Sequence, residues 1–157
     1  MVNTADKEVE KNISNNTDSF SERFVLKIPA EIEKLDDVLL FVDTQLESVD
    51  CPLKTQMQLD VVVEELFVNI AHYAYEGKSG DAIISMLFNK ETSEVEIEFK
   101  DSGIAFDPLA KADPDVTLSA EDRQIGGLGI FMVKKNVDFI DYRRENDQNI
   151  LVIRKKM

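Results

Sequence analysis

Residues 81–101 read DAIISMLFNKETSEVEIEFKD, and this stretch decides the fold class. In its second half Val95, Ile97 and Phe99 alternate with charged residues. Alternation with period two is typical of a strand that buries one face and exposes the other. An apolar run precedes it, and the NKETS segment between the two halves resembles a hairpin connection. The sequence therefore predicts two antiparallel strands, 81–90 and 94–101.

Helices are predicted before this hairpin and a second hairpin after it. The remaining predicted elements are a strand at 23–28, an amphipathic helix at 30–49, a helix from 52 to 76 that ends at Gly77, a long loop at 102–125, a short helix at 130–137, and strands at 138–145 and 149–155. Hairpin-joined strands with grouped helices are typical of an α+β fold rather than a doubly wound sheet. We expect a two-layer α/β sandwich whose mixed, mostly antiparallel sheet is covered on one face by about three helices.

Length and composition limit the classes of function. A chain of 157 residues fits one domain, expected at 21–157 after a flexible polar tail at 1–20. The 18 Lys and Arg residues against 31 Asp and Glu residues give a net charge of −13, which disfavours binding to nucleic acid or to an anionic membrane. The single Cys51 excludes an internal disulfide and a multi-cysteine zinc site. With no apolar run of about 18 residues, a cytoplasmic protein is expected.

Residues 65–75, ELFVNIAHYAY, place polar side chains beside an apolar helix face. Glu65 and Asn69 lie one helical turn apart, about 6 Å along the axis, and His72 falls on the same line. Glu64 points elsewhere, toward solvent. A helix margin often carries such polar pairs without any function, so the pair becomes informative only together with motifs downstream.

Two glycine-containing motifs follow. The first, KDSGIAFDP (100–108), places Asp101 at a strand end, where it can accept a hydrogen bond from an exocyclic amine, and Gly103 where a flat ring can approach the backbone. The second, GGLGIF (126–131), precedes a helix, where free backbone N–H groups favour an anion. A plain turn and a plain loop-to-helix transition are the alternatives. Neither motif is a Walker-type phosphate loop.

Taken in order, these three motifs resemble the ATP-binding domain of the GHKL superfamily. From about residue 22 to 155 the chain is most similar to the stand-alone serine kinases that act as bacterial anti-sigma factors. The resemblance implies that Glu65 is the general base, that Asn69 holds Mg²⁺, and that Asp101 binds the adenine amine with Gly103 beneath the ring. It also implies phosphate contacts from three glycines under a lid at about 108–125: Gly126, Gly127 and Gly129.

Some residues depart from the family pattern or leave two interpretations open. The family commonly has His four residues after the Asn, whereas here Tyr73 takes that place and His72 comes one residue earlier. The helical line puts His72 closer to Glu65 than Tyr73, but a structural role for this histidine is favoured. Arg123 could reach the γ-phosphate or remain solvated. For Lys134 and Lys135 a solvated helix face is favoured over a phosphate contact.

The resemblance implies an ATP- and Mg²⁺-dependent protein serine/threonine kinase that phosphorylates an anti-anti-sigma-type regulator. The alternative is a nucleotide-gated module that sequesters a sigma factor or another regulator with little catalysis. A histidine-kinase catalytic domain is disfavoured, because the only histidine lies inside the nucleotide motif. The resemblance also suggests a homodimer.

Overall fold

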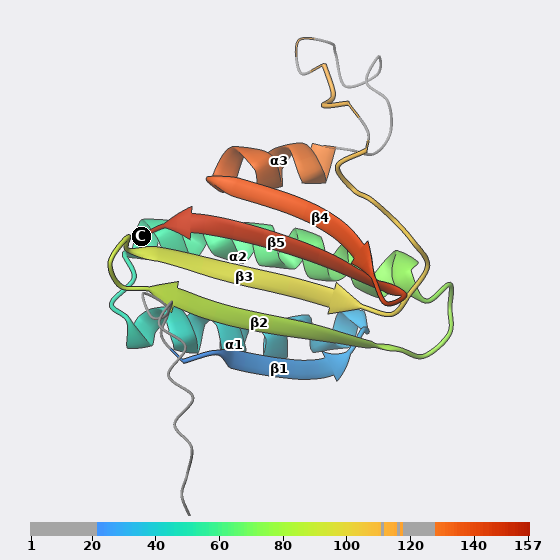
Figure 1. Cartoon of the computed structure of the whole chain (residues 1–157), viewed down its shortest axis with the longest axis horizontal. Helices are drawn as coiled ribbons and strands as arrows, with labels where there is room; N and C mark the ends of the chain where they lie inside the picture. The colour runs from blue at the N-terminus through green and yellow to red at the C-terminus, as the bar shows by residue number, and fades with distance from the viewer. Residues whose placement is uncertain (1–21, 111, 116, 118–127) are drawn as a thin grey trace, which may run out of the picture.

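The computed structural model describes residues 22–110, 112–115, 117 and 128–157, and within them the chain forms one sheet with helices packed on it (Figure 1). The five strands, in the spatial order β1-β2-β3-β5-β4, are β1 (Phe24–Pro29), β2 (Asp81–Asn89), β3 (Glu94–Asp101), β5 (Gln148–Lys156) and β4 (Phe139–Glu145). Every pairing between neighbours is antiparallel. The α+β sandwich is confirmed, but the expected mixed sheet is antiparallel throughout these strands: two of the four pairings are hairpins, and the other two, β1 with β2 and β3 with β5, are also antiparallel.

Two long helices cover one face of the sheet, behind it in Figure 1, and α3 (Leu128–Asn136) packs against the second of them. The predicted helix at 30–49 is divided into a short 3-10 turn, η1 (Ile32–Lys34), and α1 (Leu35–Ser48). Its start is delayed because the Ala30 N–H donates to Gly80 O (2.9 Å), which keeps this segment beside β2. The helix predicted at 52–76 is α-helical only as α2 (Leu53–Asn69), and continues as a π-helical turn, η2 (Ile70–Ala74).

The core lies between the sheet and these helices. Val95, Ile97 and Phe99 are at most 2% exposed, which confirms the side of β3 that the alternation assigns to the interior. Register places Ile153 opposite Ile97 and Leu151 opposite Phe99. The helices contribute nine further buried side chains: Val38, Val42, Leu46, Leu59, Val62, Val63, Leu66, Phe67 and Val133. The inward row of β3 ends at Asp101, so a carboxylate lies at the edge of an apolar core.

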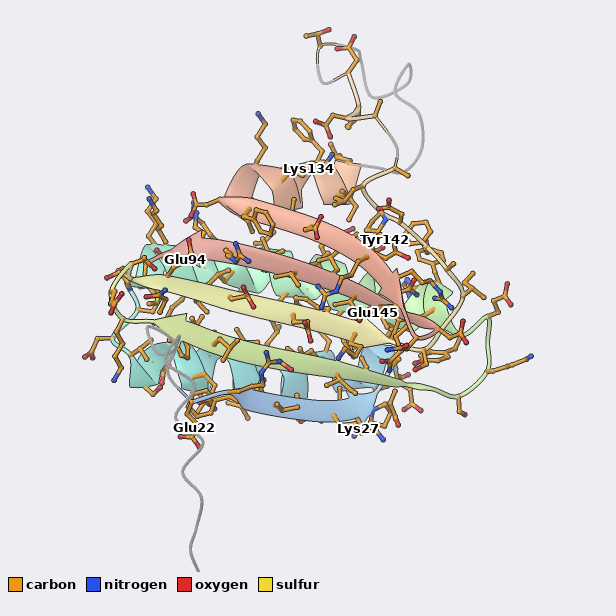
Figure 2. The ribbon with its side chains drawn as sticks, viewed as in Figure 1. Glu22, Lys27, Glu94, Lys134, Tyr142 and Glu145 are labelled. Carbon is orange, nitrogen blue, oxygen red and sulfur yellow. The ribbon has the colours of Figure 1, made fainter. Side chains whose placement is uncertain are left out.

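The opposite face of the sheet, viewed in Figure 2, is covered by charged side chains. Glu98 is only 13% exposed because Arg143, Lys100 and Arg23 surround it at 3.5, 3.6 and 3.9 Å. Among the described residues, no helix combines the length and apolar character needed to cross a bilayer. The predicted tail at 1–20 lies outside the described residues.

Candidate active site

The end of α2 carries the first pair of candidate residues. Asn69 Nδ2 donates a hydrogen bond to Glu65 Oε1 at 3.3 Å, so the two side chains lie side by side as predicted. Glu64 is exposed and belongs to the outer side of the helix. The bond uses the amide nitrogen of Asn69, which leaves the amide oxygen to act as a ligand for a cation.

The π-helical turn that follows changes which aromatic residue faces this pair. A π-turn contains more residues than an α-turn, so position 73 rather than 72 continues the line of Glu65 and Asn69. Tyr73 lines the cavities described below, together with Asn69. His72 is exposed and makes an edge contact with the Tyr73 ring at 5.8 Å between centroids. Tyr73, and not His72, therefore shares the outer cavity with Glu65, which differs from the helical line expected for a regular α-helix.

Asp101 ends β3 and is 6% exposed. Its Oδ1 accepts hydrogen bonds from the Gly103 N–H and from Asn149 Nδ2, both at 2.9 Å. Since both bonds use the same oxygen, the carboxylate has a fixed orientation and its Oδ2 can accept a bond from a ligand. The carboxylate thus offers an acceptor, and no donor, to whatever enters beside it.

Asn149, near the start of β5, forms hydrogen bonds that hold the segment after β3 in place. It was not predicted from the sequence as a site residue. Its Nδ2 donates to Ile104 O at 2.7 Å as well as to Asp101. Its Oδ1 accepts bonds from Tyr142 Oη at 2.7 Å and from the Phe106 N–H at 3.3 Å; Figure 2 shows Tyr142 on β4 beside this segment. A signal existed, because Asn149 shares the inward register of Leu151 and Ile153, where an amide needs partners.

A neighbouring set of hydrogen bonds attaches the segment directly after β3, residues 102–106, to the end of the π-helical turn. The Ile104 N–H donates to Ala74 O at 2.8 Å, and a Cβ on Gly103 would collide with the Ala74 backbone. Glycine is thus required here by close backbone packing, a reason different from the ring approach expected for it. The Tyr75 hydroxyl accepts from the Ser102 N–H at 2.9 Å and donates to the backbone oxygen at the start of β2, and burial raises its pKa.

Two connected cavities are lined by several of the side chains described so far. The inner cavity, about 50 Å³, is walled mainly by apolar side chains and has Asp101 and Asn149 among its lining residues. Its apolar walls are Leu66, Ile70, Ala74, Phe99, Ile104, Phe106, Pro108, Ile130 and Leu151. The outer cavity, about 410 Å³, is lined by Glu65, Asn69, Asp113, Gly129 and Lys134 among others.

Both cavities are lined by Asn69, Tyr73, Phe106, Pro108 and Ile130, so they form one continuous depression. One end is apolar with a fixed carboxylate, and the other end is charged. A ligand that fits both ends has a flat apolar part with a hydrogen-bond donor and a polar extension.

The first turn of α3 meets α2 at the charged end. A Cβ on Gly129 would collide with the Glu65 carboxylate, so this position brings the backbone of α3 against the candidate base. Of the predicted residues, Glu65, Asn69, Asp101 and Gly129 therefore line one depression, with Gly103 on the segment beside Asp101. Arg123, Gly126 and Gly127 lie outside the described residues.

Comparison with known proteins agrees with this arrangement. The chain is 25% identical over 100 residues to "Serine/threonine-protein kinase BtrW" of Bordetella bronchiseptica, an alignment that covers 64% of this chain and 70% of the relative. It is 27% identical over 115 residues to "Anti-sigma F factor" of Clostridium acetobutylicum, covering 73% and 74% respectively. Residues 28–155 match the histidine kinase-like ATPase domain, which is the ATP-binding domain of GHKL proteins. Since the match spans most of the chain and the sandwich and the depression agree with it, this protein belongs to the histidine kinase-like ATPase family.

Proposed function

We propose that this protein binds ATP with Mg²⁺ and transfers the terminal phosphoryl group to a serine or threonine of an anti-anti-sigma-type regulator. The observation that carries the proposal is the continuous depression with Asp101 at its apolar end and the Glu65–Asn69 pair at its charged end. Adenine fits the apolar end, because its exocyclic amine is the donor that a fixed carboxylate selects.

The donor groups at the charged end fit a magnesium ion carried by the nucleotide. Among the described residues there is no group of three or more His, Cys, Asp or Glu side chains that could hold a metal by itself. Mg²⁺ commonly uses one or two protein oxygens, substrate phosphates and water, so the Asn69 amide oxygen is a sufficient protein ligand. The ion would neutralise phosphate charge during transfer. Gly126, Gly127, Gly129 and Arg123 are proposed to contact the phosphates, on the basis of the family resemblance.

Glu65 is proposed as the general base. Its carboxylate would accept the proton of the substrate hydroxyl as the hydroxyl oxygen bonds to the γ-phosphorus and the bond to the β-phosphate oxygen breaks. The Asn69 hydrogen bond holds this carboxylate, and Gly129 leaves it room because a Cβ at that position would collide with it. Phosphoryl transfer depends mainly on such positioning and on charge neutralisation.

The decisive experiment measures transfer of labelled phosphate from ATP to a candidate regulator of the anti-anti-sigma type. Glu65→Gln should lower the transfer rate by about 10²–10⁴-fold, the usual contribution of a general base, while ATP affinity stays near wild type. Glu64→Gln is the matched control, since it changes an exposed neighbour on the same helix. The same rate for wild type and Glu65→Gln would refute the assigned role.

A second function is favoured by one observation, the name "Anti-sigma F factor" of a relative. In that case the protein acts as a nucleotide-gated module that sequesters a sigma factor or another regulator with little turnover. Its net charge of −13 suits a basic partner surface. The two functions are separated by measuring capture of the partner by wild type and Glu65→Gln in the presence of ADP or ATP. If Glu65→Gln still regulates its partner, the nucleotide-gated module is supported over the kinase. The cytoplasmic location and the homodimer remain predictions.

A further inference from the structure

Lys134 on α3 forms the tightest ion pair at the charged end of the depression. Its Nζ lies 2.7 Å from Asp113 Oδ1, in the segment before the glycines, and both residues line the outer cavity. The Lys134 side chain is 28% exposed and that of Asp113 is 52% exposed. Figure 2 shows Lys134 on the helix at this end of the molecule. Lys134 therefore does not lie on a fully solvated helix face, which the sequence favoured, because it pairs with Asp113 and lines the outer cavity.

The charged side chains described around the outer cavity do not by themselves attract a phosphate chain while this ion pair holds. Its charged lining residues, among those described, are Glu65, Asp113 and Lys134, which sum to one negative charge. A nucleotide brings several more negative charges to the same space, and like charges at short range repel strongly in a partly desolvated site. Among the described residues of this lining, Lys134 is the cationic side chain that can oppose them.

We propose that Lys134 binds the phosphates of the nucleotide, and that Asp113 is a carboxylate that competes with the phosphates for it. This rests on nucleotide binding in the depression, as proposed above. On binding, the lysine ammonium exchanges the Asp113 carboxylate for a phosphate oxygen, and Asp113, the more exposed partner, turns into solvent. No covalent bond changes in this exchange.

The neighbouring lysine provides a matched control. Lys135 Nζ lies 5.3 Å from the centre of the Phe131 ring, and Lys135 is not among the residues that line the outer cavity. A second control is the exposed pair of Lys34 and Asp37, whose N···O distance is 3.6 Å, at the start of α1. Lys135→Gln and Asp37→Asn therefore change the net charge as the test variants do, but away from the depression.

The experiment is calorimetric titration of the full chain with adenosine, ADP and ATP in the presence of Mg²⁺. Lys134→Gln should weaken ADP and ATP binding by about tenfold or more, the range of a charge-assisted hydrogen bond, and leave adenosine binding unchanged. Asp113→Asn should tighten ADP and ATP binding by about two- to fivefold, because a surface ion pair is weak but must be broken. In the double variant the gain from Asp113→Asn should vanish.

Three outcomes would overturn the proposal. Equal losses for adenosine and ATP in Lys134→Gln would indicate a structural defect instead of a phosphate contact. Weaker or unchanged ATP binding in Asp113→Asn would exclude competition between Asp113 and the phosphates. An effect of Lys135→Gln equal to that of Lys134→Gln would show a general charge effect instead of a contact made by Lys134. If the wild-type protein fails to bind ATP, the proposed function fails as well. If it binds ATP but transfers no phosphate, only the kinase assignment fails and the titrations still decide the role of Lys134.

Discussion

Replacement of Asn149 by aspartate tests how the depression selects its ligand. The side chain keeps its shape, but Nδ2, which donates to Asp101 Oδ1 at 2.9 Å and to Ile104 O at 2.7 Å, becomes an oxygen. Two donated hydrogen bonds are lost, and two carboxylates come into contact. On the other side Tyr142 and Arg144, which donate to Asn149 Oδ1, can still do so.

The size of the effect follows from these contacts. Each lost hydrogen bond is worth about 1 kcal/mol, so the two together amount to about 2 kcal/mol. Because ATP binding uses the Asp101 carboxylate in its fixed orientation, restoring that orientation costs up to this amount, or up to about 30-fold in affinity for ATP. Repulsion between the carboxylates adds to this loss at high pH. Protonation of the introduced carboxyl restores a donor, and a nearby like charge makes protonation easier. ATP affinity of Asn149→Asp should therefore be weakest near pH 8 and recover toward pH 5.5.

The assay is ATP titration of wild type and variant between pH 5.5 and 8, with thermal unfolding measured on the same samples. Gln148→Glu is the matched control, because Gln148 precedes Asn149 and makes one exposed bond, from Nε2 to Ser102 Oγ at 3.2 Å. It should change ATP affinity by no more than about threefold, the range of one exposed hydrogen bond. Wild-type affinity for folded Asn149→Asp at pH 8, or a loss that does not change with pH, would refute the reasoning.

Three further predictions concern catalysis and stability. Gly129→Ala should push the Glu65 carboxylate aside and lower the rate of phosphoryl transfer by about 10²-fold at saturating ATP; an unchanged kcat would contradict this. Burial, together with a hydrogen bond and the charge of Asp43, raises the pKa of Asp60 to about 6. The folded state therefore holds a proton that the unfolded chain releases at lower pH. The free energy of unfolding falls as pH rises from about 4 through 6. Because the pair is partly exposed, Asp60→Asn should gain on the order of 1 kcal/mol above pH 7, a rise in Tm of about 2–4 °C, and much less near pH 4; an equal rise in Tm at both pH values would exclude this cause. Tyr75→Phe loses both hydrogen bonds of its hydroxyl and should lower the free energy of unfolding in urea by about 1–3 kcal/mol, and an unchanged midpoint would show that these bonds are not needed.

The local pattern of the sequence was sufficient for the layers of the fold. Alternation in 94–101 depends on the two-residue repeat of a strand, and helical spacing depends on the turn of a helix, so both can be read from nearby residues. The same local order placed Glu65 and Asn69 on one line and Asp101 at a strand end. These positions also carry the family motifs, which is why the resemblance could propose roles for them.

Contacts between distant segments, which no local repeat encodes, decided the rest of the site. Asn149 bonds to Asp101 across 48 residues of sequence, and only the antiparallel register of β3 and β5 places them together. Similarly, the π-turn at 70–74 ends where Ala74 O accepts a bond from Ile104, and this turn replaces His72 by Tyr73 in the depression. By itself the sequence determined which chemical groups the protein carries and on which elements they lie. The tertiary structure decided which oxygen of Asp101 stays open and which lysine meets the outer cavity, because hydrogen-bond partners are fixed by packing across the sheet and not by position along the chain.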